Sequence, residues 1–401
     1  MYDRVYGGGL TRPSLNKRGV RTVMSPTTSW SALRTVSRVG LRARTYSRQV
    51  ERRHVDNLVL VLGAGASRDL GSNGKKMPLM EDWNNILRGE LDVRQAGLSR
   101  LVGIQENQSG PDFEKALGRF LQWRSVLDLA ARFLPLGFAD PSQCNKARWQ
   151  DQAEIRARMV DDALNRTLYA EFGEERASRA DAHAAYEALL RALTFNAAAR
   201  IVVATTNYDP AAELAFEELE LSPDNGDATG RGGVRRLSPE GLVGRCQQGR
   251  QRAVLHLHGK VGWYNQSDGS VEVHNHRERF NDSAGVPTIV WPDPAKNPEN
   301  DPSMPPPIRV LWHEFRQALQ QATHVLVIGH SLNDPTLVEA INASSARKAV
   351  SSLSSHDDTE TLRLKHLIPT ADIIFGSFGP YLRSGKLVPF LGNLAAWSAP
   401  S

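Results

Sequence analysis

The chain has 401 residues, of which 40% are hydrophobic and 23% are charged, as in ordinary globular proteins. This composition excludes a wholly disordered chain, and no apolar run reaches the roughly 18 residues of a membrane helix. The two cysteines, Cys144 and Cys246, form no CxxC pair. They exclude a disulfide framework and a cysteine-rich zinc site, and they favour a reducing, cytoplasmic location.

The net charge of +5 comes from one end of the chain. Residues 1–54 hold 12 of the 49 Lys and Arg residues against only Asp3 and Glu51, so they carry a net +10. The other 347 residues hold 37 basic and 42 acidic residues, a net −5. The high isoelectric point therefore does not indicate that the fold binds nucleic acid.

Residues 1–54 are rich in Arg, Ser, Thr and Gly and have no periodic apolar residues. Such a segment cannot bury enough apolar surface to fold, so a disordered extension is predicted. A start site misassigned upstream of Met24, a basic partner-binding arm and an organellar transit peptide are the alternatives. Residues 55–400 are predicted to form one domain.

From residue 56 onward, short apolar runs rich in β-branched residues recur far apart in the sequence. Continuous apolar runs suit strands that are buried on both faces of a parallel sheet. Four runs are strong and the last is a weaker candidate: residues 57–62, 200–204, 253–257, 324–328 and 372–375. Helical patterns lie between them, which predicts the α/β class.

The helical patterns cover residues 112–134 and 148–198, with apolar residues at three-to-four spacing. A gap of 137 residues separates the first two strands. This gap is too long for one crossover, so a helical subdomain inserted at about residues 100–198 is predicted. Residues 221–252, with seven glycines, and 292–307, with seven prolines, are predicted loops.

Each strong strand runs into a motif of glycine or polar residues. Ligands bind beyond the carboxyl ends of the strands in open parallel sheets, so the four motifs predict one shared cleft. The motifs are Gly63-Ala64-Gly65-Ala66-Ser67, Thr205-Thr206-Asn207-Tyr208-Asp209, His258-Gly259-Lys260 and Gly329-His330-Ser331-Leu332-Asn333-Asp334.

Gly63-Ala64-Gly65 follows a strand and is predicted to begin a helix. Glycines there allow the backbone to approach a pyrophosphate, and a helix N-terminus supplies N–H donors. A tight turn without a ligand is the other interpretation. Arg68 interrupts the strict GxGxxG pattern, which disfavours a hydride-transfer dehydrogenase.

Polar side chains in the second and third motifs are candidates for chemistry. The amide of Asn207 can orient a water molecule or a ribose hydroxyl, or it can be a turn residue. Asp209 can bind a ligand or cap a helix expected at residues 211–220. His258 is the best candidate for a base at neutral pH. His256 lies two residues earlier and is expected on the same face of the strand, so spacing cannot choose between the two. A metal site that uses both histidines lacks an evident third ligand.

Together these motifs resemble the sirtuin superfamily in order and spacing over roughly residues 57–340. The matching residues are Gly63, Ala64, Gly65, Ser67 and Gly71, then Thr205, Asn207 and Asp209, then His258 and Gly259, and finally Gly329 and Ser331. The resemblance implies a Rossmann-like parallel sheet that binds NAD without a metal. It implies catalytic roles for His258 and Asn207, and NAD binding by Gly63, Ala64, Gly65, Ser67, Thr206, Asp209, Gly329, Ser331 and Asp334.

Two departures separate the chain from deacylase sirtuins. It lacks their four-cysteine zinc module, and Met77-Pro-Leu-Met80 stands where they carry Pro-Asp-Phe-Arg. The remaining pattern resembles bacterial sirtuin-like effectors, which hydrolyse NAD, typically in antiphage defence. This resemblance implies an NAD hydrolase, and some members of the family act with a hexameric translocase-type ATPase or an Argonaute-like protein. Because an enzyme that destroys an essential cofactor must be restrained, a homo-oligomer or such a co-encoded partner is expected. A non-catalytic module that binds NAD or ADP-ribose, and a zinc-less deacylase or ADP-ribosyltransferase, are the alternatives.

Overall fold

The computed structural model divides the chain into two units, residues 1–53 and residues 54–401. The predicted disordered extension, residues 1–54, lies outside the described residues. The structure describes residues 57–109, 112–120, 144–173, 176–193, 200–218, 228–229, 235–237, 252–266, 270–273, 286–290, 298, 304–352, 358–376, 378 and 387–398.

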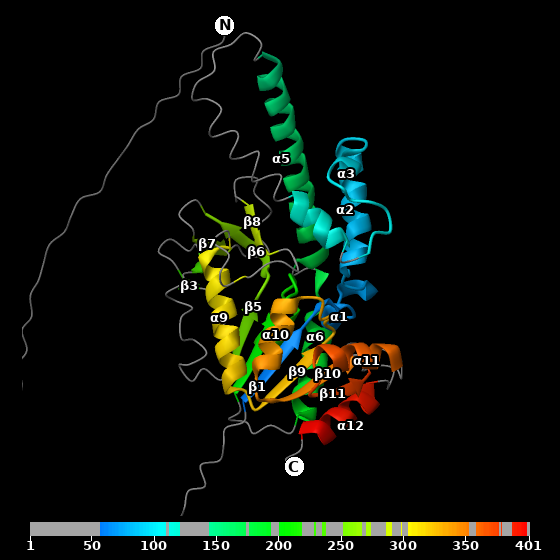
Figure 1. Ribbon diagram of the computed structural model, residues 1–401, viewed down its shortest axis with the longest axis vertical. Coiled ribbons are helices and arrows are strands. Elements are labelled where there is room, and N and C mark those ends of the chain that lie inside the picture. Colours follow the sequence, from blue (N-terminus) through cyan, green and yellow to red (C-terminus); the bar gives the residue numbers. More distant parts are fainter. Residues whose placement is uncertain are drawn as a thin grey trace, which may run out of the picture. The chain divides into compact units, whose positions relative to one another are not determined.

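A six-stranded parallel sheet forms the centre of the second unit (Figure 1). Its strands are β1 (Asn57–Leu62), β2 (Arg200–Thr205), β5 (Arg252–His256), β9 (His324–Ile328), β10 (Arg347–Ser352) and β11 (Ala371–Phe375). They lie in the order β11-β10-β9-β1-β2-β5, with every neighbouring pair parallel. This is the order of two βαβαβ halves that meet between β1 and β9. The predicted Rossmann-like α/β class is confirmed.

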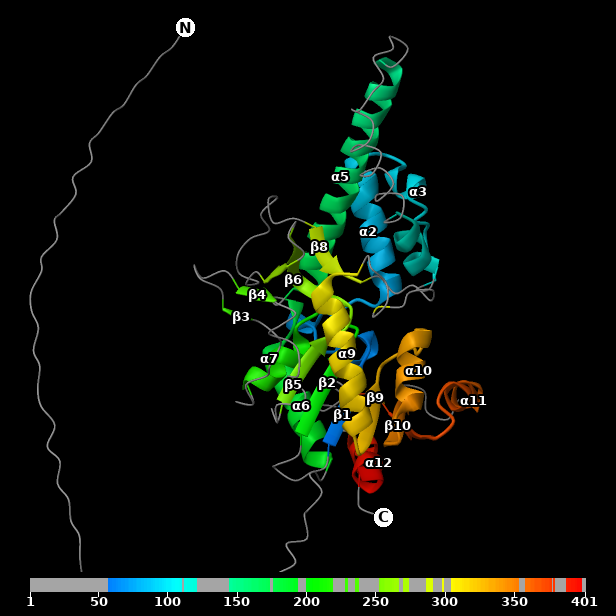
Figure 2. The ribbon, with the colours of Figure 1, turned by 60° about the vertical axis from the view of Figure 1, so that its left-hand side comes forward.

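Both faces of the sheet are covered by helices, which explains the continuous apolar runs (Figure 2). One face is covered by α9 (Pro306–Gln321), α10 (Pro335–Ala343) and α11 (Asp358–Leu367), and the other by α6 (Arg179–Ala192), α7 (Ala211–Glu218) and α12 (Leu387–Ser398). In β1, Val59 and Val61 pack in the core with the first three helices, whereas Leu58 and Leu60 pack in the core with the other three.

A third core is helical and lies beyond the carboxyl ends of the strands (Figure 1). Its centre is Trp83, whose ring makes edge contacts with Phe113 and Phe172, each at 5.5 Å between centroids. The core is built from α2 (Met80–Arg94), α3 (Leu98–Leu101), helical residues 112–120 and α5 (Cys144–Phe172).

The inserted helical core differs from the predicted range of about 100–198 at both ends. It begins earlier, because Met77 and the α2 residues Trp83, Leu87 and Leu91 belong to it. It ends earlier, because α6 packs against the sheet. The predicted helical pattern over 148–198 corresponds to two helices: α5 ends before Gly173, and Ser178 caps α6 by accepting a hydrogen bond from the Asp181 N–H.

A second, antiparallel sheet was not anticipated. It follows the order β3-β4-β7-β6-β8 and lies on the same side as the helical core (Figure 1). Its strands are β3 (Ala228–Thr229), β4 (Arg235–Leu237), β6 (Gly259–Asn265), β7 (Val271–Val273) and β8 (Val286–Ile289). The prediction of a loop at 221–252 was therefore wrong where β3 and β4 form. Most of the proline-rich segment 292–307 lies outside the described residues, but Pro306 and Pro307 begin α9.

Candidate functional site

A cavity of about 600 Å³ borders the carboxyl edge of the parallel sheet, within the usual range for small-molecule sites. It lies where the two halves of the sheet meet. The predicted site residues come together there, and all of them line the cavity: Gly63, Ala64, Gly65, Ser67, Thr206, Asn207, Asp209, His258, Gly329, Ser331 and Asp334. The prediction of one shared cleft is confirmed, whereas the role of each residue stays a prediction.

The loops after β1 and β9 pack directly on each other. The Gly63 N–H donates to the Ile328 carbonyl oxygen at 3.0 Å, and the Gly65 N–H donates to the Gly329 carbonyl oxygen at 2.9 Å. A Cβ on Gly63 would lie 2.5 Å from the His330 Cα, so no side chain fits. The glycines are thus required by loop packing.

This packing changes the expected role of the glycine loop. The loop was predicted to begin a helix whose N-terminus receives a pyrophosphate, but α1 (Ala64–Ser67) is a single turn of four residues. Two of the N–H groups expected for the ligand are already bonded to the β9 loop. The predicted helix thus begins at the expected place but is short, and binding of a pyrophosphate at its N-terminus stays a prediction. Because they have no side chains, the glycines allow the two loops to pack closely and form one wall of the cavity with their backbone.

We expect Gly329→Ala to destabilise the protein by about 2 kcal/mol or more. Gly329 has a φ of +62°, and an added Cβ would lie 2.2 Å from the Ala66 nitrogen. Gly89, inside α2, has no atom within 4 Å of an added Cβ, so Gly89→Ala should instead stabilise by about 0.5–1 kcal/mol. Urea unfolding of both variants measures the difference. Equal stabilities would contradict the loop packing.

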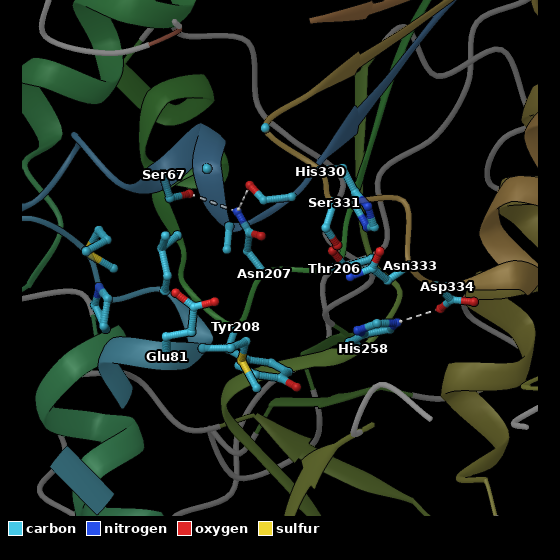
Figure 3. Close-up of a pocket in the computed structure, with 18 of the residues that line it drawn as sticks. Ser67, Glu81, Thr206, Asn207, Tyr208, His258, His330, Ser331, Asn333 and Asp334 are labelled. Atoms are coloured by element: carbon cyan, nitrogen blue, oxygen red, sulfur yellow. Dashed lines mark hydrogen bonds and ion pairs between the residues drawn. The ribbon is translucent and has the colours of Figure 1, made fainter. Parts of the chain in front are cut away.

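Asn207 follows β2, and its side chain is fixed on one side only (Figure 3). Its Nδ2 donates to the Gly63 carbonyl oxygen at 2.9 Å and to the Ser67 Oγ at 3.0 Å. Its Oδ1 is buried and has no hydrogen-bond partner among the described residues. An unsatisfied buried carbonyl costs about 1–3 kcal/mol. Because Asn207 lines the cavity, this oxygen is a candidate acceptor for a ligand.

Asp209 binds Ser67, which is one of the two hydrogen-bond partners of the Asn207 side chain. Its Oδ1 accepts from the Ser67 hydroxyl at 3.0 Å and from the Ala211 N–H at 2.9 Å, at the start of α7. Burial raises the pKa of its carboxyl, while these bonds act to lower it. The helix-capping interpretation of Asp209 thus describes its contacts, although the residue also lines the cavity.

His258 lies in the turn between β5 and β6, at the other end of the cavity wall from Ser67 (Figure 3). Its Nε2 is 3.5 Å from the Asp334 Oδ2, an ion-pair distance. The Asp334 Oδ1 accepts from the N–H groups of Thr336 and Leu337 and so caps α10. Asp334 thus caps α10 and lies beside His258, and its predicted contact with NAD stays a prediction.

The structure separates the two histidines that spacing could not distinguish. Strand β5 ends at His256, so residues 257 and 258 form a turn and the strand alternation does not continue. His256 is fully buried and packs against Trp263, with ring centroids 5.7 Å apart. The expectation that both histidines share one face was therefore wrong, and His258 is the one that lines the cavity.

Other lining residues were missed. Ser351 and Ser352 end β10, whose run Arg347–Ser352 has only two apolar residues and gave a weak strand signal. Arg363 of α11 donates to the Ser331 carbonyl oxygen at 3.0 Å and pairs with Glu360. The helical core adds an apolar wall that includes Met77, Leu79, Met80 and Phe172. Helical periodicity alone could not show that this wall faces the sheet.

Within the described residues, no three His, Cys, Asp or Glu side chains are grouped as a metal site. Among the described helices, none has the length and apolarity to cross a membrane.

Residues 201–358 match the family model described as "SIR2-like domain". The matched segment spans less than half of the chain and contains Asn207, His258 and Asp334. It supports a sirtuin-like relationship for this part of the chain. No curated protein matches. A solved structure of cytosolic 5′-nucleotidase IIIB bound to cytidine is 11% identical, covering 85% of this chain and 86% of that one, with a TM-score of 0.29. That score is too low to indicate a shared fold.

Proposed function

We propose that the protein is an NAD⁺ hydrolase that cleaves NAD to nicotinamide and ADP-ribose. The observation that carries the proposal is the placement of Asn207 and His258 on one cavity between the two halves of the sheet. The SIR2-like match supports it, since such domains use NAD. The cavity volume and the unpaired Asn207 oxygen fit a ligand that carries hydroxyl groups.

The proposed chemistry needs positioning and a proton acceptor. Asn207 would accept a hydrogen bond from a ribose hydroxyl or from the attacking water. His258 would take the proton released as water adds to the ribose carbon, with Asp334 stabilising the charged imidazole. The bond from ribose to nicotinamide breaks with its electron pair on nicotinamide, which leaves as a neutral molecule. The proton then passes from His258 to solvent.

Incubation of the purified full chain with NAD, followed by chromatography for nicotinamide and ADP-ribose, tests the proposal. Hydrolysis predicts equal amounts of both products, independent of any acyl-peptide. Nicotinamide released only with an acyl-lysine peptide would instead show a deacylase. Binding of NAD without turnover would show a non-catalytic module. Retention of both Asn207 and His258 favours turnover, because a binding module needs no base.

We further propose, from the resemblance to bacterial effectors, that the activity serves antiphage defence and depends on assembly. An enzyme that destroys an essential cofactor must be restrained in the cell, and a homo-oligomer or a co-encoded partner would supply that restraint. Specific activity should therefore change across a dilution series, in step with light scattering. A monomer with full activity at every concentration, and no response to co-encoded proteins, would contradict this expectation.

A further inference from the structure

A group of buried charged and titratable side chains lies behind the cavity without lining it. Glu213 of α7, His256 of β5 and Lys260 of β6 are 3%, 0% and 4% exposed. The Lys260 Nζ donates to both carboxylate oxygens of Glu213 at 2.9 Å. Although burial acts to raise it, the charges of Lys260 and His256 hold the pKa of Glu213 well below its usual range. Glu213 is therefore ionised in the interior.

A buried ion pair is weak evidence for stability, because desolvation offsets most of its attraction. What the pair connects is more informative. Glu213 lies on the helix that follows the Asn207 loop, six residues after Asn207. Lys260 lies two residues after His258. The intervening Gly259 has a φ of +78°, and an added Cβ would lie 1.9 Å from the Thr288 carbonyl oxygen. Lys260 therefore adjoins the turn that carries His258, whose backbone packs closely on β8.

His256 extends the connection to Asn207 itself. Its Nε2 is 3.4 Å from the Glu213 Oε2, and its Nδ1 is 3.4 Å from the Asn207 carbonyl oxygen. A carbonyl oxygen only accepts, so this contact places a proton on Nδ1. The Val261 N–H also donates to the Tyr208 carbonyl oxygen at 3.1 Å. The loop after β2 and the turn after β5 are thus joined through side chains and backbone.

We propose that Glu213, His256 and Lys260 are positioning residues, which hold the Asn207 loop against the His258 turn and set the relative placement of these two side chains. Their effect on catalysis rests on the proposed function. The mechanical coupling of the two loops does not depend on it, and can be measured without activity.

The double variant Glu213→Leu/Lys260→Met removes both buried charges and keeps apolar volume, a replacement that is often tolerated. The control is Phe216→Leu, which lies on the same helix but packs against Tyr186 on the sheet side. We expect faster amide exchange at residues 205–210 and 257–261 in the double variant and not in the control. The kcat for NAD should fall on the order of 10²-fold, with KM nearly unchanged.

A second pair of variants tests His256. Asparagine can place a donor near the Nδ1 position, so His256→Asn should retain more of the wild-type kcat than His256→Leu. Wild-type exchange in both loops of the double variant would overturn the proposal. So would faster exchange spread evenly over the fold. If the wild-type chain does not cleave NAD, either alone or with its co-encoded proteins, the proposed function fails. The amide exchange of the two loops then decides this inference by itself.

Discussion

Replacing His258 by alanine should abolish NAD cleavage and leave the chain folded. The loss of a general base typically removes on the order of 10²–10⁴ in rate. The backbone of the turn should persist, because it is held without the imidazole: the His258 carbonyl oxygen accepts from the Val290 N–H at 2.8 Å, and the Trp312 Nε1 donates to the Leu257 carbonyl oxygen at 3.0 Å. Nicotinamide release and thermal denaturation measure the two effects.

His366 provides the matched control for this variant. It is an exposed histidine on α11 and does not line the cavity. His366→Ala should keep the wild-type rate. Full activity of the His258→Ala variant would show that another group accepts the proton.

Asp334→Asn should give an intermediate rate, since it removes the charge beside His258 and keeps an oxygen that can cap α10.

Asn207→Ala should also abolish cleavage, with a loss on the order of 10²-fold or more. The substitution removes the unpaired Oδ1 and the two bonds from Nδ2 to Gly63 and Ser67. Some stability will be lost with those bonds, about 1–3 kcal/mol for the buried acceptors left behind. The assay must therefore compare activity per folded molecule.

Asn84 provides the matched control for the Asn207→Ala variant. It is buried in the helical core, its Nδ2 donates to the Gln105 carbonyl oxygen at 2.9 Å, and its Oδ1 is also unpaired. Asn84→Ala should lower the stability by a similar amount and leave the activity per folded molecule unchanged. If both variants lose activity in proportion to their unfolding, Asn207 has no special role in the reaction.

The central sheet was predictable because helices bury it on both faces. Strands β1, β2, β5 and β9 have continuous apolar runs, and their carboxyl ends carry the glycine and polar motifs that meet at the cavity. Strand β10 was missed because its outer residues are charged or small. Even so, Ser351 and Ser352 at its end line the cavity.

Features set by tertiary contacts could not be predicted. The antiparallel sheet contains strands of only two to seven residues, within segments rich in turn signals. The end of β5 at His256 separates two histidines that alternation places on one face. The buried Glu213–Lys260 pair joins residues 47 positions apart. No sequence motif around Glu213 or Lys260 predicts that the two residues pair.

The most direct test is a crystal structure of the His258→Ala variant with NAD, because removing the proposed base should preserve the substrate. The account predicts NAD in the cavity, with the bond between ribose and nicotinamide near residue 258 and a hydroxyl or water bonded to the Asn207 Oδ1, about 3 Å away. NAD bound outside this cavity would contradict it, as would NAD inside it with the scissile bond far from both residues.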